Sequence, residues 1–140
     1  MVSTKGRYAL RLMIDLAVYA EDGYIPLKVI SEREEISLKY LEQVTARLIQ
    51  AGLLKGLRGN QGGYRLSKPA KDYTAGEILR AAEGTLAPVA CLEPLVNPCR
   101  RRNKCSTIEF WQGYYEAVAG YVDGITLEEL AVKAKENKKK

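Results

Sequence analysis

The chain has 140 residues, 46% of them apolar, and a net charge of +5. This length suits one domain with an appendage and allows a hydrophobic core that needs no disulfides. The apolar content excludes a disordered chain. The basic excess suggests an anionic partner. No apolar run of about 20 residues and no signal-peptide layout is present, so we expect a cytoplasmic protein without a membrane span. The complete lack of histidine argues against an enzyme.

Three helices are expected in the first half of the chain. Apolar residues recur at three- and four-residue spacing over residues 4–20, which predicts a helix with one buried face. A short second helix is expected over residues 27–34. Ser37 is a good N-cap for a third helix over residues 38–51. We expect this third helix to bury one stripe of apolar side chains, formed by Leu38, Leu41, Val44, Leu48 and Ile49.

A β-hairpin follows these helices. Two short strand-like runs, 53–58 and 64–66, flank a glycine-rich turn. Three helices followed by a hairpin predict a winged helix-turn-helix, so the expected fold is mainly α with a small β-hairpin. The expected organisation is a DNA-binding domain over 1–84, a cysteine-rich loop over 85–105, a dimerisation helix with a short C-terminal helix over 106–136, and a basic tail over 137–140.

Three capping boxes mark helix starts, at residues 74–77, 106–109 and 126–129. The helix opened by the second box carries apolar residues at alternating spacings of three and four, which is typical of a coiled-coil seam. We expect this seam to form a homodimer, and packing against the protein's own domain is the alternative. The seam comprises Ile108, Trp111, Tyr115, Val118 and Val122.

The third helix has the pattern of a DNA recognition helix, with one buried face and one polar face. Tyr40, Gln43 and Arg47 fall on one line away from the apolar stripe. Glutamine pairs with adenine edges, and arginine pairs with guanine or phosphate. Ser37 at the cap is placed to contact a phosphate. These residues predict contact with the major groove of duplex DNA.

The hairpin tip strengthens this prediction. Arg58 stands just before the glycine-rich turn, and narrow minor grooves attract arginine. A merely structural hairpin would need two glycines, whereas this turn has Gly59, Gly62 and Gly63. We therefore expect the tip to approach a groove of the same duplex.

Cys91, Cys99 and Cys105 lie in one proline-rich loop at spacings of eight and six. Thiolates are ligands of iron–sulfur clusters and of zinc, and the basic residues between the last two cysteines favour thiolates. An odd number of cysteines argues against a disulfide framework. The alternatives are three scattered, unreactive cysteines, or a zinc-stabilised module for protein interaction.

Three segments, 3–9, 36–43 and 58–64, resemble the IscR-type winged-helix regulators, a family that includes NsrR, RirA and CymR. The match covers roughly residues 2–132. The resemblance implies a homodimer on operator DNA, with the recognition helix in the major groove and the wing arginine in the minor groove. Lys39 stands where IscR has a small serine. Glu42 matches the glutamate that, in IscR, biases the choice between operator types. The expected DNA-binding set is Ser37, Lys39, Tyr40, Glu42, Gln43, Arg47, Arg58 and Gly59.

The resemblance also implies an iron–sulfur cluster, of the [2Fe–2S] type, on the three cysteines. In IscR a histidine completes the ligand set, and Ile108 stands at that position here. Arg7 stands where NsrR-like proteins carry an acidic ligand. The fourth ligand remains open among Glu93, Glu42, a hydroxyl, a water and a small thiol.

The function implied by the resemblance is regulation of iron–sulfur cluster biogenesis genes in response to cluster status. A CymR-like regulator of cysteine or sulfur metabolism, sensing through a partner protein, is an alternative. A regulator of the same family that senses nitric oxide or iron is another.

Overall fold

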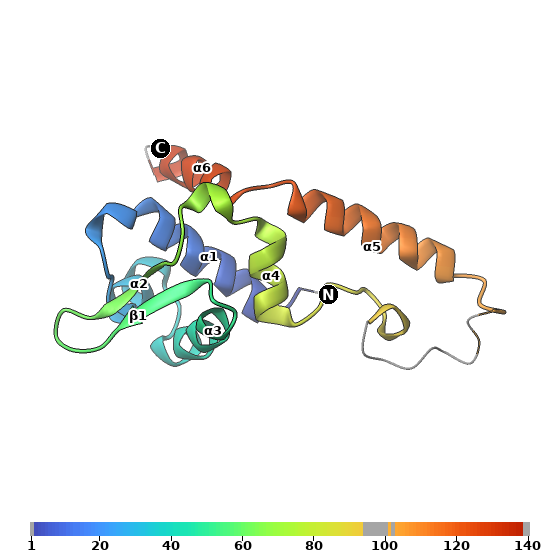
Figure 1. Cartoon of the computed structure of the whole chain (residues 1–140), viewed down its shortest axis with the longest axis horizontal. Coiled ribbons are helices and arrows are strands. Elements are labelled where there is room, and N and C mark those ends of the chain that lie inside the picture. Colours follow the sequence, from blue (N-terminus) through green and yellow to red (C-terminus); the bar gives the residue numbers. More distant parts are fainter. Residues whose placement is uncertain (1, 94–100, 102, 139–140) are drawn as a thin grey trace.

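The computed structural model describes residues 2–93, 101 and 103–138. It is mainly helical with one two-stranded antiparallel hairpin, which confirms the predicted fold class (Figure 1). In the described ranges, none of the helices has the length and apolar character needed to cross a membrane. The elements in chain order are α1 Thr4–Val18, η1 Ala20–Asp22, α2 Leu27–Glu34, α3 Leu38–Gln50, β1 Leu54–Leu57, β2 Gly63–Leu66, η2 Ala70–Asp72, α4 Ala75–Glu83, η3 Ala90–Leu92, α5 Ile108–Asp123 and α6 Leu127–Lys138.

Helix α1 is the centre of the core, and it packs against α2, α3, α4 and α6. Its buried side chains recur at helical spacing because one face of α1 points into the domain. That face includes Ala9, Leu12, Met13 and Leu16. Each of the surrounding helices contributes a buried apolar residue to the same cluster, namely Ile30, Leu41, Leu48, Ile78 and Leu127.

The predicted buried stripe of α3 is wrong at its two ends. Leu38 is 42% exposed and Ile49 is 41% exposed. Successive residues turn by about 100° around a helix axis. Around that axis, both side chains lie to the same side of the stripe that Leu41, Val44 and Leu48 form. The buried face is completed instead by Thr45, whose hydroxyl donates to the Glu42 carbonyl at 3.0 Å.

The hairpin pairs β1 with β2 in the register Leu54↔Leu66 to Leu57↔Gly63. β1 packs on α3 and β2 packs on α1. A further bridge joins Ile25, just before α2, to Tyr64. The hairpin is therefore fixed to two helices and to Ile25 before α2, and it does not stand free.

One of the three predicted capping boxes is complete, and a second has only the bond to its threonine hydroxyl, because the Glu77 carboxylate accepts from Lys68 instead. The Thr126 hydroxyl accepts from the Glu129 amide at 3.1 Å, and the Glu129 carboxylate accepts from the Thr126 amide at 3.2 Å. The Thr74 hydroxyl accepts from the Glu77 amide at 3.0 Å. The box predicted at 106–109 is wrong, since the N-cap Thr107 makes no capping bond with its side chain.

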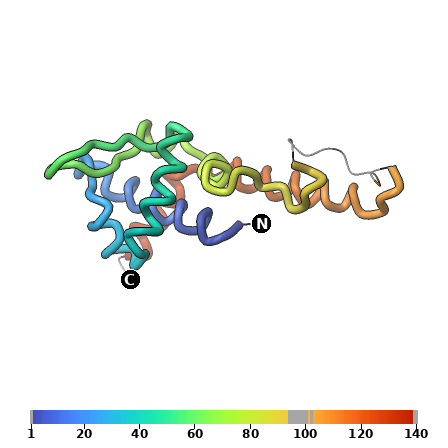
Figure 2. Tube along the Cα trace, turned by 90° about the horizontal axis from the view of Figure 1, so that it is seen from below, coloured from blue at the N-terminus to red at the C-terminus, as the bar shows by residue number. Residues whose placement is uncertain are grey.

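Helix α5 extends away from the rest of the domain, and α6 returns to lie along α1 (Figures 1 and 2). The Ala75 amide donates to the Ile125 carbonyl at 2.8 Å, and the Leu127 amide donates to the Tyr73 carbonyl at 3.0 Å. These bonds fix the C-terminal end of α5, which lies beside the domain (Figure 1), to the start of α4. The N-terminal end of α5 follows the cysteine-containing segment.

Candidate nucleic-acid interface and cysteine segment

The polar face of α3 is open along most of its length. Ser37 caps the helix by accepting from the Tyr40 amide at 3.2 Å. Lys39, Glu42 and Gln43 are exposed on the side opposite the buried stripe. Because side chains on one helical face lie three or four residues apart, this arrangement is suited to a DNA groove.

Tyr40 and Arg47 contact neighbouring helices as well as lying on the polar face. The Tyr40 hydroxyl lies 3.1 Å from Thr4 Oγ1, and its ring packs edge-on against the Tyr8 ring at 5.4 Å. Arg47 Nη1 donates to the Ala82 carbonyl at 3.2 Å. These two residues therefore join α3 to α1 and α4, a role that the sequence pattern did not reveal.

Lys5 is a cation at this surface that the sequence reasoning missed. It lines a hollow of about 360 Å³ beside α3, together with Gln43 and Arg47. The segment 3–9 supplied part of the family resemblance, but no helical pattern indicated that its lysine would lie next to α3. A lysine beside the recognition helix adds a positive charge for a phosphate.

The hairpin tip carries Arg58 in an exposed position. The argument from the number of glycines is wrong, because each glycine has a structural cause. Gly59 has φ +109°, in the region that favours glycine. A Cβ on Gly62 would collide with the Leu57 carbonyl, and a Cβ on Gly63 would collide with the Ile25 carbonyl. The prediction that the tip contacts DNA is therefore supported by Arg58 and not by the glycines.

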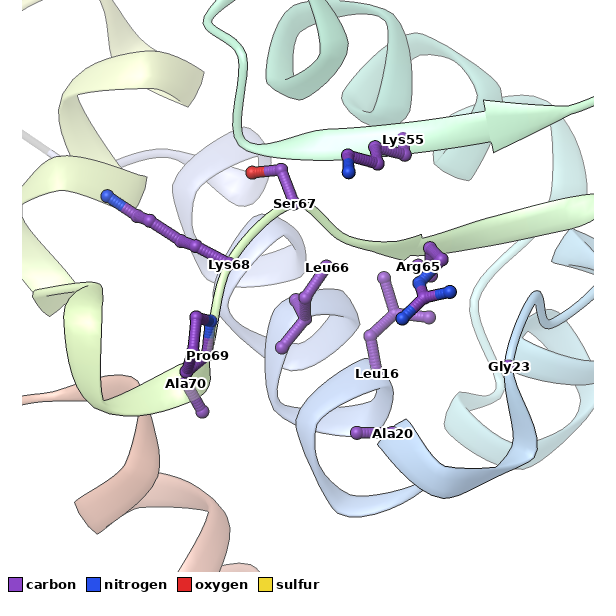
Figure 3. Close-up of a pocket in the computed structure, with 10 residues that line it drawn as sticks. All are labelled: Leu16, Ala20, Gly23, Lys55, Arg65, Leu66, Ser67, Lys68, Pro69 and Ala70. Carbon is purple, nitrogen blue, oxygen red and sulfur yellow. The ribbon is translucent and has the colours of Figure 1, made fainter.

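The other basic residues of the hairpin lie along its stem. Lys55 and Arg65 are direct partners across the two strands. Figure 3 shows them with Lys68 around a pocket of about 380 Å³, above Leu16 of α1. Lys68 Nζ is 3.0 Å from Glu77 Oε1, and the Arg65 guanidinium stacks 5.4 Å from the Tyr24 ring centroid. The basic residues of the hairpin region are thus divided between the tip and the stem.

Two of the three cysteines belong to the described structure. Cys91 lies in η3 and Cys105 lies just before α5, and both are half-buried free thiols. Cys99 lies outside the described residues. In the ranges that the structure covers, no three histidine, cysteine or acidic side chains form a metal-binding group. Among the residues considered as fourth ligands, Glu93 is half-buried and Glu42 is exposed.

The Cys105 thiol has a lowered pKa. The main cause is the hydrogen bond with the Thr107 hydroxyl, at an Sγ–Oγ1 distance of 3.5 Å, and the backbone amides of Thr107 and Ile108 and the charge of Arg101 add to it. The same hydroxyl is unused as a helix cap, which explains the missing capping bond at α5. Thiolates are the form that binds iron–sulfur clusters, so the donor chemistry fits such a group.

Helix α5 has no buried residue in this chain. All five predicted seam residues are half-buried, and Trp111 and Val118 line an apolar hollow of about 500 Å³ with Val2 and Leu86. Both alternatives for the seam thus remain open, since part of it faces the protein's own domain. Sequence reasoning missed a second apolar line with more exposure, formed by Phe110 (64%), Tyr114 (50%) and Tyr121 (70%).

Comparisons with known proteins agree with this geometry. Residues 2–133 match the Rrf2 family model, described as an iron-dependent transcriptional regulator. The transcriptional regulator IscR of Klebsiella pneumoniae is 40% identical over 129 residues, which are 92% of this chain and 78% of that protein. IscR of Photobacterium profundum is 39% identical over 129 residues, 92% of this chain and 74% of that protein.

Solved structures show the same similarity. CymR, the global cysteine regulator of B. subtilis, is 41% identical with a TM-score of 0.77, over 95% of this chain and 97% of that one. The T. potens IscR structure is 35% identical with a TM-score of 0.75, over 98% of this chain and 90% of that one. These relatives are regulators of transcription and not enzymes.

Proposed function

The chain belongs to the Rrf2 family of iron-dependent transcriptional regulators, and on that premise we propose that it is a homodimer that senses iron–sulfur cluster status. It binds operator DNA through α3 and the hairpin tip, and it controls genes of iron–sulfur cluster biogenesis. The observation that carries the proposal is the packing of β1, which leads to Arg58, directly on α3. This packing holds the polar face of α3 and the arginine in a fixed relation for one duplex.

Each exposed residue of this surface has a role in the proposal. Gln43 reads a base edge in the major groove, and Lys39 and Glu42 select among operators. Arg58 enters the adjacent minor groove. Ser37 and Lys5 contact phosphates, which fix the register of the protein on the duplex.

We propose that α5 forms the dimer with α5 of a second copy. Support comes from the absence of buried residues along α5 and from its exposed aromatic line, Phe110, Tyr114 and Tyr121. Large exposed apolar patches of this kind mark interaction sites. Two-fold symmetry then presents two copies of α3 to successive major grooves, and the operator is a palindrome with half-sites about one helical turn apart.

We propose that Cys91, Cys99 and Cys105 hold a [2Fe–2S] cluster, with the fourth ligand outside the histidine class. When bound, the cluster supplies a centre that oxidants, nitric oxide and iron scarcity can remove. The chain's own contribution is the hydrogen bond from Thr107, which lowers the pKa of Cys105 and so favours its thiolate form. In this proposal the state of the three thiols biases the orientation of the two recognition helices, because the cysteine segment joins α4 to α5. The reduced thiols that this needs favour action in the cytoplasm.

A CymR-like regulator of sulfur metabolism is the second candidate function. It is favoured by the match to CymR, which covers 97% of that protein's chain. Three thiols in one segment favour the cluster-sensing function instead. Anaerobic reconstitution with iron and sulfide separates the two, followed by absorbance and EPR spectra and by iron and sulfide counts. About two irons per chain are expected, and a colourless, iron-free protein would support the CymR-like function.

The DNA-binding surface is tested with a duplex selected from a randomised pool by the wild-type protein. Replacement of Arg58 or Gln43 by alanine should weaken binding to that duplex by about 1–3 kcal/mol, whereas Lys71→Ala should leave it unchanged. Lys71 is the matched control because it is an exposed cation in η2, which packs on α6. Unchanged affinity in both Arg58→Ala and Gln43→Ala would overturn the proposal.

A further inference from the structure

The last residue of α4 binds the first turn of α1. The Glu83 carboxylate accepts from the Ser3 amide at 2.7 Å, from the Ser3 hydroxyl at 2.8 and 3.0 Å, and from the Gly6 amide at 2.8 Å. Burial raises the pKa of Glu83, but the Ser3 and Gly6 hydrogen bonds outweigh it, so the pKa is lowered. A carboxylate from a distant helix thus satisfies amides that the start of α1 leaves unpaired.

The missing side chain of Gly6 makes room for this contact. A Cβ at this position would lie 2.7 Å from Glu83 Oε1 and 3.2 Å from a methyl group of Leu79. Gly6 has no positive φ angle that would require glycine. A glycine costs about 1 kcal/mol relative to alanine inside a helix. The close approach of Glu83 is therefore the reason for glycine at this position.

The same turn of α1 contacts the recognition helix. Thr4 lies between the two residues that bind Glu83, and its hydroxyl meets the Tyr40 hydroxyl at 3.1 Å. Tyr8, one turn further along, packs against the Tyr40 ring. The residue before Glu83 makes a parallel link, since the Ala82 carbonyl accepts from Arg47 of α3. Glu83 and its neighbours thus connect the end of α4 to two side chains of α3.

On its other side, Glu83 leads into the segment that contains Cys91. Leu86 and Ala87 of this segment are buried, each 6% exposed. Leu86 lines the apolar hollow together with Val2, which immediately precedes Ser3, and with Trp111 of α5. Figure 2 shows this segment and α5 leaving the domain side by side. The segment therefore has neighbours on both sides of the Glu83 junction.

We propose that Glu83 is a positioning residue that connects the cysteine segment to DNA recognition. Its carboxylate fixes the first turn of α1 to the end of α4, and that turn sets the position of Tyr40 on α3. A change in the segment after Glu83 alters this attachment and reaches the DNA-binding face. The inference depends on the proposed DNA-binding function and adds a route for its regulation.

The first test compares Glu83→Ala with Glu77→Ala, using the cysteine-reduced full chain and the selected duplex. Glu77 lies on the same helix and pairs with Lys68, but it makes none of these contacts with α1. Glu83→Ala should weaken binding by at least about fivefold, and Glu77→Ala should not. In NMR spectra of the free protein, Glu83→Ala should also shift the Tyr40 signals, which a loss of stability elsewhere would not do selectively.

Two further variants change residues of α1 that belong to the same junction. Gly6→Ala displaces the Glu83 carboxylate while improving helix propensity, so it should weaken DNA binding although α1 remains helical. Thr4→Val removes the hydroxyl that meets Tyr40 and keeps the side-chain shape. In the double variant Glu83→Ala with Thr4→Val, the losses of binding free energy should be less than additive, because both act through one junction.

Several outcomes would overturn the inference. These are wild-type affinity in folded Glu83→Ala, unshifted Tyr40 signals, or fully additive losses in the double variant. Each is distinguishable from failure of the proposed function, because Arg58→Ala and Gln43→Ala report on the DNA surface directly. If those two variants weaken binding and Glu83→Ala does not, the DNA surface stands and the junction role is rejected.

Discussion

The carboxylate of Asp15 in α1 accepts hydrogen bonds from both Nη2 and Nε of Arg33 in α2, at 2.7 and 3.0 Å. The Asp15 side chain is fully buried, and the Arg33 guanidinium also lies over the Tyr19 ring at 3.8 Å. This pair fixes the first helix of the helix-turn-helix unit to the central helix of the core.

Removing Arg33 should leave an uncompensated buried charge. We expect Arg33→Ala to lower the free energy of unfolding by about 3 kcal/mol, measured by urea denaturation. Arg11→Ala is the matched control, because Arg11 pairs with Glu34 on the same two helices but is 45% exposed. Its cost should be below about 1 kcal/mol. Equal costs for the two variants would show that burial of the pair does not matter.

Gly63 of the hairpin should be difficult to replace. A Cβ there would collide with the Ile25 backbone, which cannot move without breaking the Ile25–Tyr64 bridge. We expect Gly63→Ala to destabilise the protein by more than about 2 kcal/mol. Gly52→Ala provides the comparison, since Gly52 has φ +77° but open space around it, and its cost should be about 1 kcal/mol. A smaller loss for Gly63→Ala than for Gly52→Ala would contradict this account.

Asp123 should make stability depend on pH in the acid range. Arg80 donates to both of its carboxylate oxygens, at 2.6 and 3.0 Å, and these bonds lower the pKa of Asp123 against the opposing effect of burial. A lowered folded pKa means that this stabilisation is present above the ordinary pKa of about 3.9 and is lost as pH falls through the folded value. Thermal melts of wild type and Asp123→Asn should therefore differ at pH 6 and converge in strong acid, at roughly pH 2. A difference that persists there would assign it to another cause.

Thr107 should control the reactivity of Cys105. In a chain with the other two cysteines changed to serine, iodoacetamide should modify Cys105 more slowly after Thr107→Val, because the hydroxyl that lowers the thiol pKa is gone. The difference should be clear near pH 7 and disappear at roughly pH 10, where the thiol is ionised in both proteins. Ser106→Ala serves as the control, and equal rates for all three proteins at pH 7 would reject the role of Thr107.

Local patterns in the sequence were sufficient for the helices, the hairpin and most of the caps. Helix α2 begins and ends where the pattern predicts, and Thr74 and Thr126 cap the helices that they were expected to cap. These features depend on residues within a few positions of one another, so spacing alone reveals them. The polar face of α3 followed from helical periodicity, and the prediction for Arg58 followed from its place just before the glycine-rich turn.

Contacts between distant residues depended on the tertiary structure. Glu83 binds Ser3 across 80 positions, and Tyr40 meets Thr4 across 36. The sequence contains every one of these side chains, but helical spacing does not tell which carboxylate reaches which amide. Gly63 illustrates the same division. The sequence identified it as part of a turn, and the approach of the Ile25 backbone gave the physical reason why a glycine is needed there.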